Sequence, residues 1–179
     1  IALARGTYHF HPETRAIIDM GGEDAKLIIV DQEEGHLVIR DFAMNTMCAA
    51  GTGSFLDQQA HRLGYSIERF SELALKSTTP PRIAGRCSVF AKTDMIHKAQ
   101  EGTPIPDILM GLAFALARNY VATLIRGDSL EPVVSLQGGV MSNRAVVHAF
   151  KTILGLEDGD VVTPPYFTVL GALGCADLA

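Results

Sequence analysis

The stretch AIIDMGGEDAKLIIVDQEEGHLVIRDF, residues 16–42, decides the fold. It contains apolar runs of about strand length at 16–20, 26–31 and 37–42, separated by glycines and acidic residues. Short apolar runs bounded by turn residues predict consecutive strands. Gly35 stands where a tight hairpin between the second and third runs needs a positive φ angle. We therefore expect an antiparallel meander of three strands.

The pattern changes from strand to helix after residues 51–53. Helical spacing relates Phe55, Leu56, Gln59, Ala60 and Leu63. Gly64 is suited to end that helix, and Ser66 is suited to cap the next one. The sequence predicts further helices at 67–75, 88–99, 104–126, 143–154 and 168–178, and strands at 133–136 and 161–162. This order predicts an α/β fold, a ribonuclease-H-like lobe with a mixed sheet flanked by helices.

Composition narrows the class of protein. The chain has 179 residues, which is typical of one domain, and its net charge of −5 argues against nucleic acid as a partner. The apolar stretch 108–125 is interrupted by Arg118 and Asn119, so we interpret it as a buried helix and expect no membrane partner. The chain opens at Ile1 without a signal-peptide pattern, and its three cysteines are widely spaced. We expect part of a longer cytoplasmic protein.

Two glycine turns form the candidate nucleotide site. The stretch DMGGEDAK, residues 19–26, places an aspartate at a strand end and paired glycines in the following turn. Glycines let backbone N–H groups approach phosphate oxygens, and a carboxylate at the same edge can hold Mg²⁺ directly or through water. Gly138 and Gly139 connect another strand to a helix, which suits a bound nucleotide. Either turn alone also fits an ordinary connection. Two together predict a nucleotide cleft.

Two of the three cysteines are candidate metal ligands. Cys48 and Cys87 each precede a predicted helix, and the positive end of a helix dipole favours a thiolate. Buried cysteines that act as small hydrophobic residues are the alternative. Cys175 lies on a small-residue helix, where we expect it to pack and not to bind metal. An iron–sulfur cluster usually takes four ligands, so a two-fold dimer would have to supply them.

These motifs resemble one family, the activators of 2-hydroxyacyl-CoA dehydratases and the ATPase subunits of benzoyl-CoA reductase. The resemblance covers nearly the whole chain and is most specific in NTMCAAGTGSF, residues 45–55, and RCSVFA, residues 86–91. Residues 19–26 resemble the family's second phosphate motif, and GGV with Asn143 resembles its adenosine motif. Glu23 stands where many relatives carry Gln.

The resemblance implies roles for individual residues, with ATP or ADP and Mg²⁺ as ligands. Asp19 would organise Mg²⁺, and Glu23 would act beside it near the terminal phosphate. The residues implied in nucleotide binding are Gly21, Gly22, Asp24, Lys26, Gly138, Gly139 and Asn143. Cys48 and Cys87 would bind a [4Fe–4S] cluster shared between two chains.

The same resemblance implies an architecture and partners. The fold would be the actin-like, sugar-kinase-like ATPase fold, with residues 1–179 forming a single C-terminal lobe and the N-terminal lobe absent. A homodimer bridged by the cluster would use ATP to drive an electron from a donor such as ferredoxin or flavodoxin into a dehydratase or reductase. Segments 83–97 and 111–120 most resemble longer members that are fused to dehydratase-like regions.

Two other functions share some of these features. A small-molecule kinase of the same superfamily would use the glycine turns but would not need two cysteines at helix starts. A non-catalytic dimerisation module bridged by zinc would need the cysteines without the turns. Because phosphoryl transfer depends on positioning from both sides of the phosphates, we expect the isolated lobe to hydrolyse ATP poorly.

Overall fold

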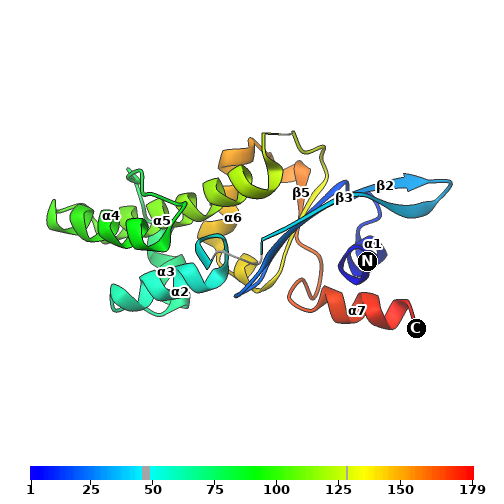
Figure 1. The fold of residues 1–179 in the computed structure, drawn as a ribbon, viewed down its shortest axis with the longest axis horizontal. Helices are drawn as coiled ribbons and strands as arrows, with labels where there is room; N and C mark the ends of the chain where they lie inside the picture. Colours follow the sequence, from blue (N-terminus) through cyan, green and yellow to red (C-terminus); the bar gives the residue numbers. More distant parts are fainter. Residues whose placement is uncertain (46–48, 128) are drawn as a thin grey trace.

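The fold is organised around a mixed β-sheet, seen in a computed structural model that describes residues 1–45, 49–127 and 129–179 (Figure 1). In the described part of the chain the strands follow the order β3-β2-β1-β4-β5. Their bounds are Ala16–Met20 (β1), Ala25–Glu33 (β2), His36–Asn45 (β3), Val134–Gln137 (β4) and Val161–Val162 (β5). The first three pair antiparallel, whereas β1 with β4 and β4 with β5 pair parallel. The predicted meander and mixed sheet are confirmed.

The meander forms because its turn residues adopt the backbone conformations that a tight hairpin needs. Glu34 and Gly35 join β2 to β3 with φ angles of 53° and 81°. Both values lie in the left-handed region that a two-residue hairpin requires. The strand β1 is buried along its whole length, as expected of a strand with a neighbour on each side and helices on both faces.

Helices account for most of the remaining chain. Their bounds are Ala2–Phe10 (α1), Gly53–Arg62 (α2), Ile67–Ala74 (α3), Ser88–Gln100 (α4), Ile105–Tyr120 (α5), Arg144–Leu154 (α6) and Leu170–Asp177 (α7). Short helical turns lie at Ala49–Gly51, Gly139–Ser142 and Asp158–Asp160, and a π-helical turn, Val121–Ile125, extends α5. The predicted caps are confirmed, because Ser66 accepts a hydrogen bond from the Arg69 amide and Gly64 has a φ of 77°. The helix α1 was not predicted.

The helices cover the sheet unequally. Alternate residues of β1 face opposite sides, so Ile18 packs into the large core with α5 and α6, whereas Ile17 joins a smaller cluster that includes Ala4 of α1. In Figure 1 α2 to α6 lie together on one side of the molecule, and α1 and α7 lie together on the other. The lobe therefore has a main core and a thin second layer.

The helix α5 is the central element of the main core. With its π-helical extension it is long and apolar enough to cross a membrane by length and composition alone, and 72% of its most apolar window is buried inside the lobe. The buried Tyr120 ring packs edge-to-face against Phe150 at a centroid distance of 5.2 Å, and its hydroxyl donates to the Lys26 carbonyl at 2.6 Å. These contacts agree with the predicted buried helix.

The second layer depends on a close contact between α1 and α7. A Cβ added to Gly174 would lie 1.8 Å from the Ala2 carbonyl oxygen, and one added to Gly6 would lie 2.3 Å from that of Leu170. Only glycine permits two backbones to approach this closely. The expectation that Cys175 is packed was wrong, because Gly174 makes the contact and the neighbouring thiol is exposed.

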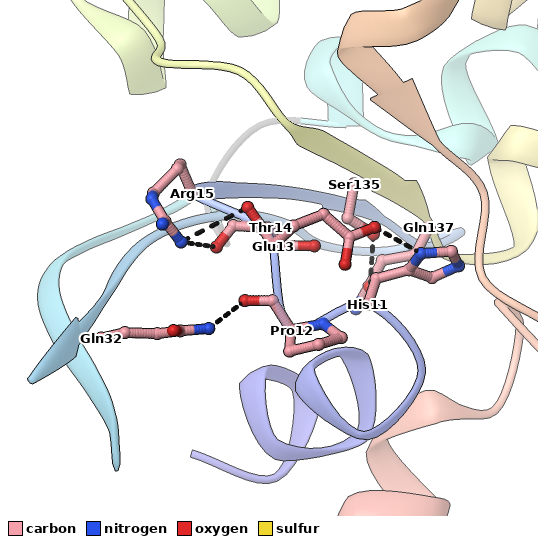
Figure 2. A network of polar contacts seen from close by, with 8 residues as sticks. All are labelled: His11, Pro12, Glu13, Thr14, Arg15, Gln32, Ser135 and Gln137. Atoms are coloured by element: carbon pink, nitrogen blue, oxygen red, sulfur yellow. Dashed lines mark hydrogen bonds and ion pairs between the residues drawn. The ribbon is translucent and has the colours of Figure 1, made fainter. Parts of the chain in front are cut away.

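Polar contacts hold the connection between α1 and β1 (Figure 2). The Arg15 guanidinium donates to the carbonyls of Glu13 and Thr14 at 3.3 and 3.2 Å. The side chain of Gln32 on β2 donates to the Pro12 carbonyl. The connection is thereby fastened to the meander.

Candidate nucleotide site and cysteine pocket

The first glycine turn, between β1 and β2, is supported by the N-terminus of α2. The Gly53 amide donates to the Gly21 carbonyl and the Ser54 amide donates to the Gly22 carbonyl, both at 2.9 Å. The Gly21 amide donates to the Asp24 carbonyl, also at 2.9 Å. Backbone hydrogen bonds therefore hold the turn in place. The space beside the Gly22 Cα stays open, because a Cβ added there would meet no atom within 4 Å.

The second glycine turn follows β4 and uses its two glycines differently. Gly138 has a φ of 90°, and a Cβ there would lie 2.4 Å from the Met20 carbonyl oxygen, so glycine is required for the fold. A Cβ added to Gly139, in contrast, would meet no atom within 4 Å. The turn ends at Asn143, whose side-chain oxygen accepts from the Ala145 amide at 3.1 Å and caps α6.

The two turns meet at one pocket of about 360 Å³. Its lining comes from both turns and from α2 and α3, and consists of Gly22, Gly53, Leu56, Asp57, Ile67, Glu68, Ser71, Gly139, Val140, Ser142 and Asn143. Asn143 is 7% exposed, and its Nδ2 has no hydrogen-bond partner within the described part of the chain. A buried donor without a partner is costly, and a ligand in this pocket would satisfy it.

A lysine and two carboxylates form a cluster beside the first turn. Asp19 lies opposite Lys26 in the antiparallel register and opposite Gln137 in the parallel one. The Lys26 ammonium lies 2.7 Å from Asp24 Oδ2 and 3.6 Å from Asp19 Oδ2. Burial raises the pKa of Asp19, and the charge of Lys26 partly opposes this. Glu23 is exposed on the turn and does not line the pocket.

Gln137, which lies opposite Asp19 in the sheet, belongs to a buried hydrogen-bond network. The Gln137 side-chain oxygen lies 2.6 Å from the Thr7 hydroxyl and 3.2 Å from that of Ser135 (Figure 2 shows the Ser135 contact). Thr7 belongs to α1, so this contact connects the second layer with the sheet residue beside the candidate catalytic carboxylate.

Cys87 lies at the start of α4, as predicted. It is half-buried, forms no disulfide and occupies the N-cap position. It lines a second pocket of about 920 Å³ between the loop before α4 and the C-terminal part of α5. Cys48 lies outside the described residues. Among the residues that are described, no three His, Cys, Asp or Glu side chains group to form a metal site.

The structure thus brings Gly22, Gly139 and Asn143 to one pocket, and it brings Asp19, Asp24 and Lys26 together beside the first turn. Sequence reasoning missed four polar residues of the lining, which are Asp57, Glu68, Ser71 and Ser142. It also assigned the glycines of residues 45–55 to the cysteine motif alone, although Gly53 both lines the pocket and supports the turn. The sequence did contain a signal for this role, because the glycines at 51 and 53 stand directly before a predicted helix.

The fold and the paired glycine turns define one lobe of an actin-like, sugar-kinase-like ATPase. A xylulose kinase from Bifidobacterium adolescentis shares the fold with a TM-score of 0.55 at 14% identity, covering 94% of this chain and 38% of the kinase. The chain belongs to the BadF/BadG/BcrA/BcrD ATPase family, whose profile matches residues 2–179.

Relatives of this chain include activators of lactoyl-CoA dehydratase and of (R)-2-hydroxyglutaryl-CoA dehydratase. The chain is 37% identical to the activator of lactoyl-CoA dehydratase from Anaerotignum propionicum, over 97% of this chain and 64% of the relative. It is 36% identical to the (R)-2-hydroxyglutaryl-CoA dehydratase activating ATPase from Acidaminococcus fermentans, with the same two coverages. The chain therefore spans about two thirds of the length of these relatives.

A solved structure of the family supports the architecture. The activator of the 2-hydroxyisocaproyl-CoA dehydratase from Clostridium difficile, with bound ADPNP, aligns with a TM-score of 0.88 at 34% identity. The alignment covers 99% of this chain and 64% of that one.

Proposed function

We propose that this chain is the C-terminal lobe of an ATP-dependent activator that delivers electrons to a 2-hydroxyacyl-CoA dehydratase or a related reductase. The observation that carries the proposal is the pocket in which two open glycines meet Asn143 Nδ2, which has no hydrogen-bond partner among the described residues. The names of the relatives support the activator role, and the ADPNP in a family structure supports the nucleotide.

The pocket has the chemistry that a nucleotide requires. Gly22 leaves open the space where phosphates would approach the backbone, and Gly139 leaves open the space where the nucleoside would lie. Asn143 Nδ2 would donate to the nucleoside, and the carboxylates of Asp57 and Glu68 are suited to accept hydrogen bonds from ribose hydroxyls. Apolar side chains on α2 and α3 complete the lining.

The carboxylate cluster supplies the candidate catalytic groups. Mg²⁺ commonly binds one or two carboxylates together with water and phosphate oxygens, a role that Asp19 fits. Lys26 would balance the charge of Asp19 and Asp24. Gly21 and Gly22 would position the phosphates, and Gly138 and Gly139 the adenosine. Glu23, exposed on the turn, would act on the water or Mg²⁺ near the terminal phosphate.

The cysteines are proposed to hold a [4Fe–4S] cluster between two copies of the chain, in a reducing cytoplasmic compartment. Cys87 fits this role in its chemistry, because its thiol is free, half-buried and at a helix N-terminus. Cys48 would complete the pair. The cluster would supply one-electron transfer, with ferredoxin or flavodoxin as the proposed donor, and Cys87 would contribute a thiolate at the positive end of α4.

Asn143→Asp in the full-length protein tests the nucleotide assignment. Aspartate keeps the oxygen that caps α6 but removes the Nδ2 donor, so stability should be unchanged while affinity for fluorescent ADP falls about tenfold. Asn143→Ala, which removes both, should lose stability as well. Unchanged ADP affinity in the aspartate variant would refute the assignment of the pocket.

Cys87→Ser, with Cys175→Ser as the matched control, tests the cluster. Iron per chain and mass by light scattering are measured on full-length protein kept free of oxygen. Wild type and Cys175→Ser should contain about two irons per chain, half of a shared four-iron cluster. Cys87→Ser should lose iron and dimer together. Retention of the full iron content by Cys87→Ser would end the bridging proposal.

A further inference from the structure

The Asp19 side chain lies on the face of the sheet that α1 covers. Residues two apart on a strand share a face, so Asp19 is on the same side as Ile17, which packs in the cluster that includes Ala4 of α1. Gln137 is the partner of Asp19 in the parallel register and therefore shares that side. Both side chains are buried. The second layer thus covers the candidate catalytic carboxylate as well as apolar sheet surface.

The Asp19 carboxylate is only loosely held by its charged neighbour. The Lys26 ammonium lies 3.6 Å from Asp19 Oδ2 but 2.7 Å from Asp24 Oδ2, so Asp24 is its main partner. A separation of 3.6 Å is too long for a hydrogen bond. Charge attraction at that distance does not fix which way the two carboxylate oxygens point, and a directional bond from another group is needed for that.

Gln137 has a donor available for this bond. Its Nε2 is buried and makes no hydrogen bond with any described residue, which is a costly arrangement for an amide. Burial raises the pKa of Asp19, whereas the charge of Lys26 and then the Gln137 side chain lower it. The amide therefore lies near enough to favour the charged carboxylate, and a small rotation of either side chain would complete the hydrogen bond.

The other end of the Gln137 amide is fixed from α1. Its Oε1 accepts from the Thr7 hydroxyl at 2.6 Å and from the Ser135 hydroxyl at 3.2 Å. Thr7 Oγ1 also lies 2.9 Å from the Leu3 carbonyl oxygen, but its one hydrogen is needed in the shorter contact. An amide turned by 180° would present its oxygen to Asp19, which a carboxylate repels. A charged Asp19 therefore selects the orientation in which Oε1 faces Thr7.

We propose that Gln137 is a positioning residue that orients the Asp19 carboxylate for Mg²⁺, and that Thr7 of α1 keeps the Gln137 amide in the required orientation. Carboxylates that bind metal ions are commonly held by hydrogen bonds from neighbouring groups. The Mg²⁺ role of Asp19 rests on the proposed function, whereas the chain of contacts from Thr7 to Gln137 rests on geometry alone. The helix α1 is then part of the nucleotide site, although it does not line the pocket.

Gln137→Leu in the full-length protein tests the positioning role, because leucine nearly keeps the volume and removes the amide. Binding of a fluorescent derivative of ADPNP is measured in EDTA and during a Mg²⁺ titration, together with urea unfolding. The Mg²⁺ concentration for half-maximal effect should rise about tenfold. Affinity in EDTA should stay within about twofold of wild type, because the amide does not contact the pocket. An unchanged Mg²⁺ requirement, or a loss of affinity that is equal with and without Mg²⁺, would overturn the proposal.

Thr7→Val tests the contact from α1 and does not depend on whether Gln137→Leu folds. Valine keeps the shape of threonine without its hydroxyl, so the half-maximal Mg²⁺ concentration should rise about threefold. In the Gln137→Leu background the same change should add less than about 1.5-fold, since residues that act through one another are not additive. Independent, multiplying effects of the two changes would contradict a role of Thr7 through Gln137.

Two matched controls use buried side chains away from Asp19. Gln59 on α2 also has an Nε2 without a partner among the described residues, and it does not line the nucleotide pocket. Thr14, before β1, has a hydroxyl without a partner in the same part of the chain. Gln59→Leu and Thr14→Val should leave the half-maximal Mg²⁺ concentration within about twofold of wild type. Rises equal to those of Gln137→Leu and Thr7→Val would overturn the proposal, because lost packing would then explain them.

The wild-type titration separates this inference from the proposed function. Wild type that binds the ADPNP derivative equally in EDTA and in Mg²⁺ would count against the Mg²⁺ role of Asp19, and with it against both proposals. Wild type that depends on Mg²⁺, with Gln137→Leu depending on it to the same degree, would count against the positioning role of Gln137 alone.

Discussion

Between α1 and α7 glycines bring two backbones together, whereas at the ends of β1 and β4 they leave space open. A Cβ added to Gly174 would lie 1.8 Å from a carbonyl oxygen of α1, and one added to Gly6 would lie 2.3 Å from a carbonyl oxygen of α7. Gly22 and Gly139 have no neighbouring atom within 4 Å of that position. The same residue type therefore serves packing in one region and ligand access in the other, and only its neighbours distinguish the two uses.

Gly174→Ala should produce the largest loss of stability. The added methyl would overlap the Ala2 carbonyl oxygen, so α7 must separate from α1, at a cost of about 3 kcal/mol or more. Urea unfolding measures the change in free energy. Gly171→Ala on the same helix is the control, because its Cβ would meet Leu3 at an ordinary 3.5 Å. Equal losses in both variants would contradict the packing role.

Gly138→Ala should come next. The φ of 90° is strained for alanine, and the methyl would approach the Met20 carbonyl oxygen at 2.4 Å. We expect a loss of about 1–3 kcal/mol in unfolding free energy. The neighbouring Gly139→Ala should change stability by less than about 0.5 kcal/mol. Similar stabilities for the two variants would show that the adjacent glycines do not differ in the way described.

Gly139→Ala should nevertheless impair ligand binding. Its methyl would occupy the open side of the pocket, so affinity for fluorescent ADP in the full-length protein should fall about tenfold, or about 1.4 kcal/mol. Gly159→Ala is the control, because that glycine also has open space but does not line the pocket. Wild-type affinity in Gly139→Ala would remove this glycine from the nucleotide site.

Asp19→Asn should have the smallest effect on stability, in the opposite direction. Burial raises the pKa of Asp19 in the folded state, so the folded protein binds this proton more tightly than the unfolded one. Stability from this group is therefore lost as pH rises through the folded-state pKa. The variant has no carboxyl group to titrate, so its unfolding free energy at neutral pH should be higher than that of wild type. Its Mg²⁺-dependent ATP hydrolysis should fall. Parallel unfolding curves at several pH values provide the measurement, and an unchanged difference across them would contradict the assignment.

Local sequence pattern was sufficient for much of the fold. The meander, the hairpin at Gly35 and the cap at Ser66 were all predicted because each depends on residues within a few positions of one another. The helix α1 was missed because it carries Gly6 and Thr7, has no side-chain cap and is stabilised by distant α7. Weak local propensity was overridden by tertiary packing.

The sequence by itself determined that Asp19, the paired glycines, Asn143 and the cysteine motifs are present, and their motifs were sufficient to indicate the family. Only the tertiary structure decided that Gly22 and Gly139 share one pocket while Gly138 packs against β1. Only it placed Glu68 in that pocket and brought Arg118 of α5 to the pocket that Cys87 lines. The physical reason is that burial, open space and charge proximity are properties of neighbours in space, which residues distant in the chain supply.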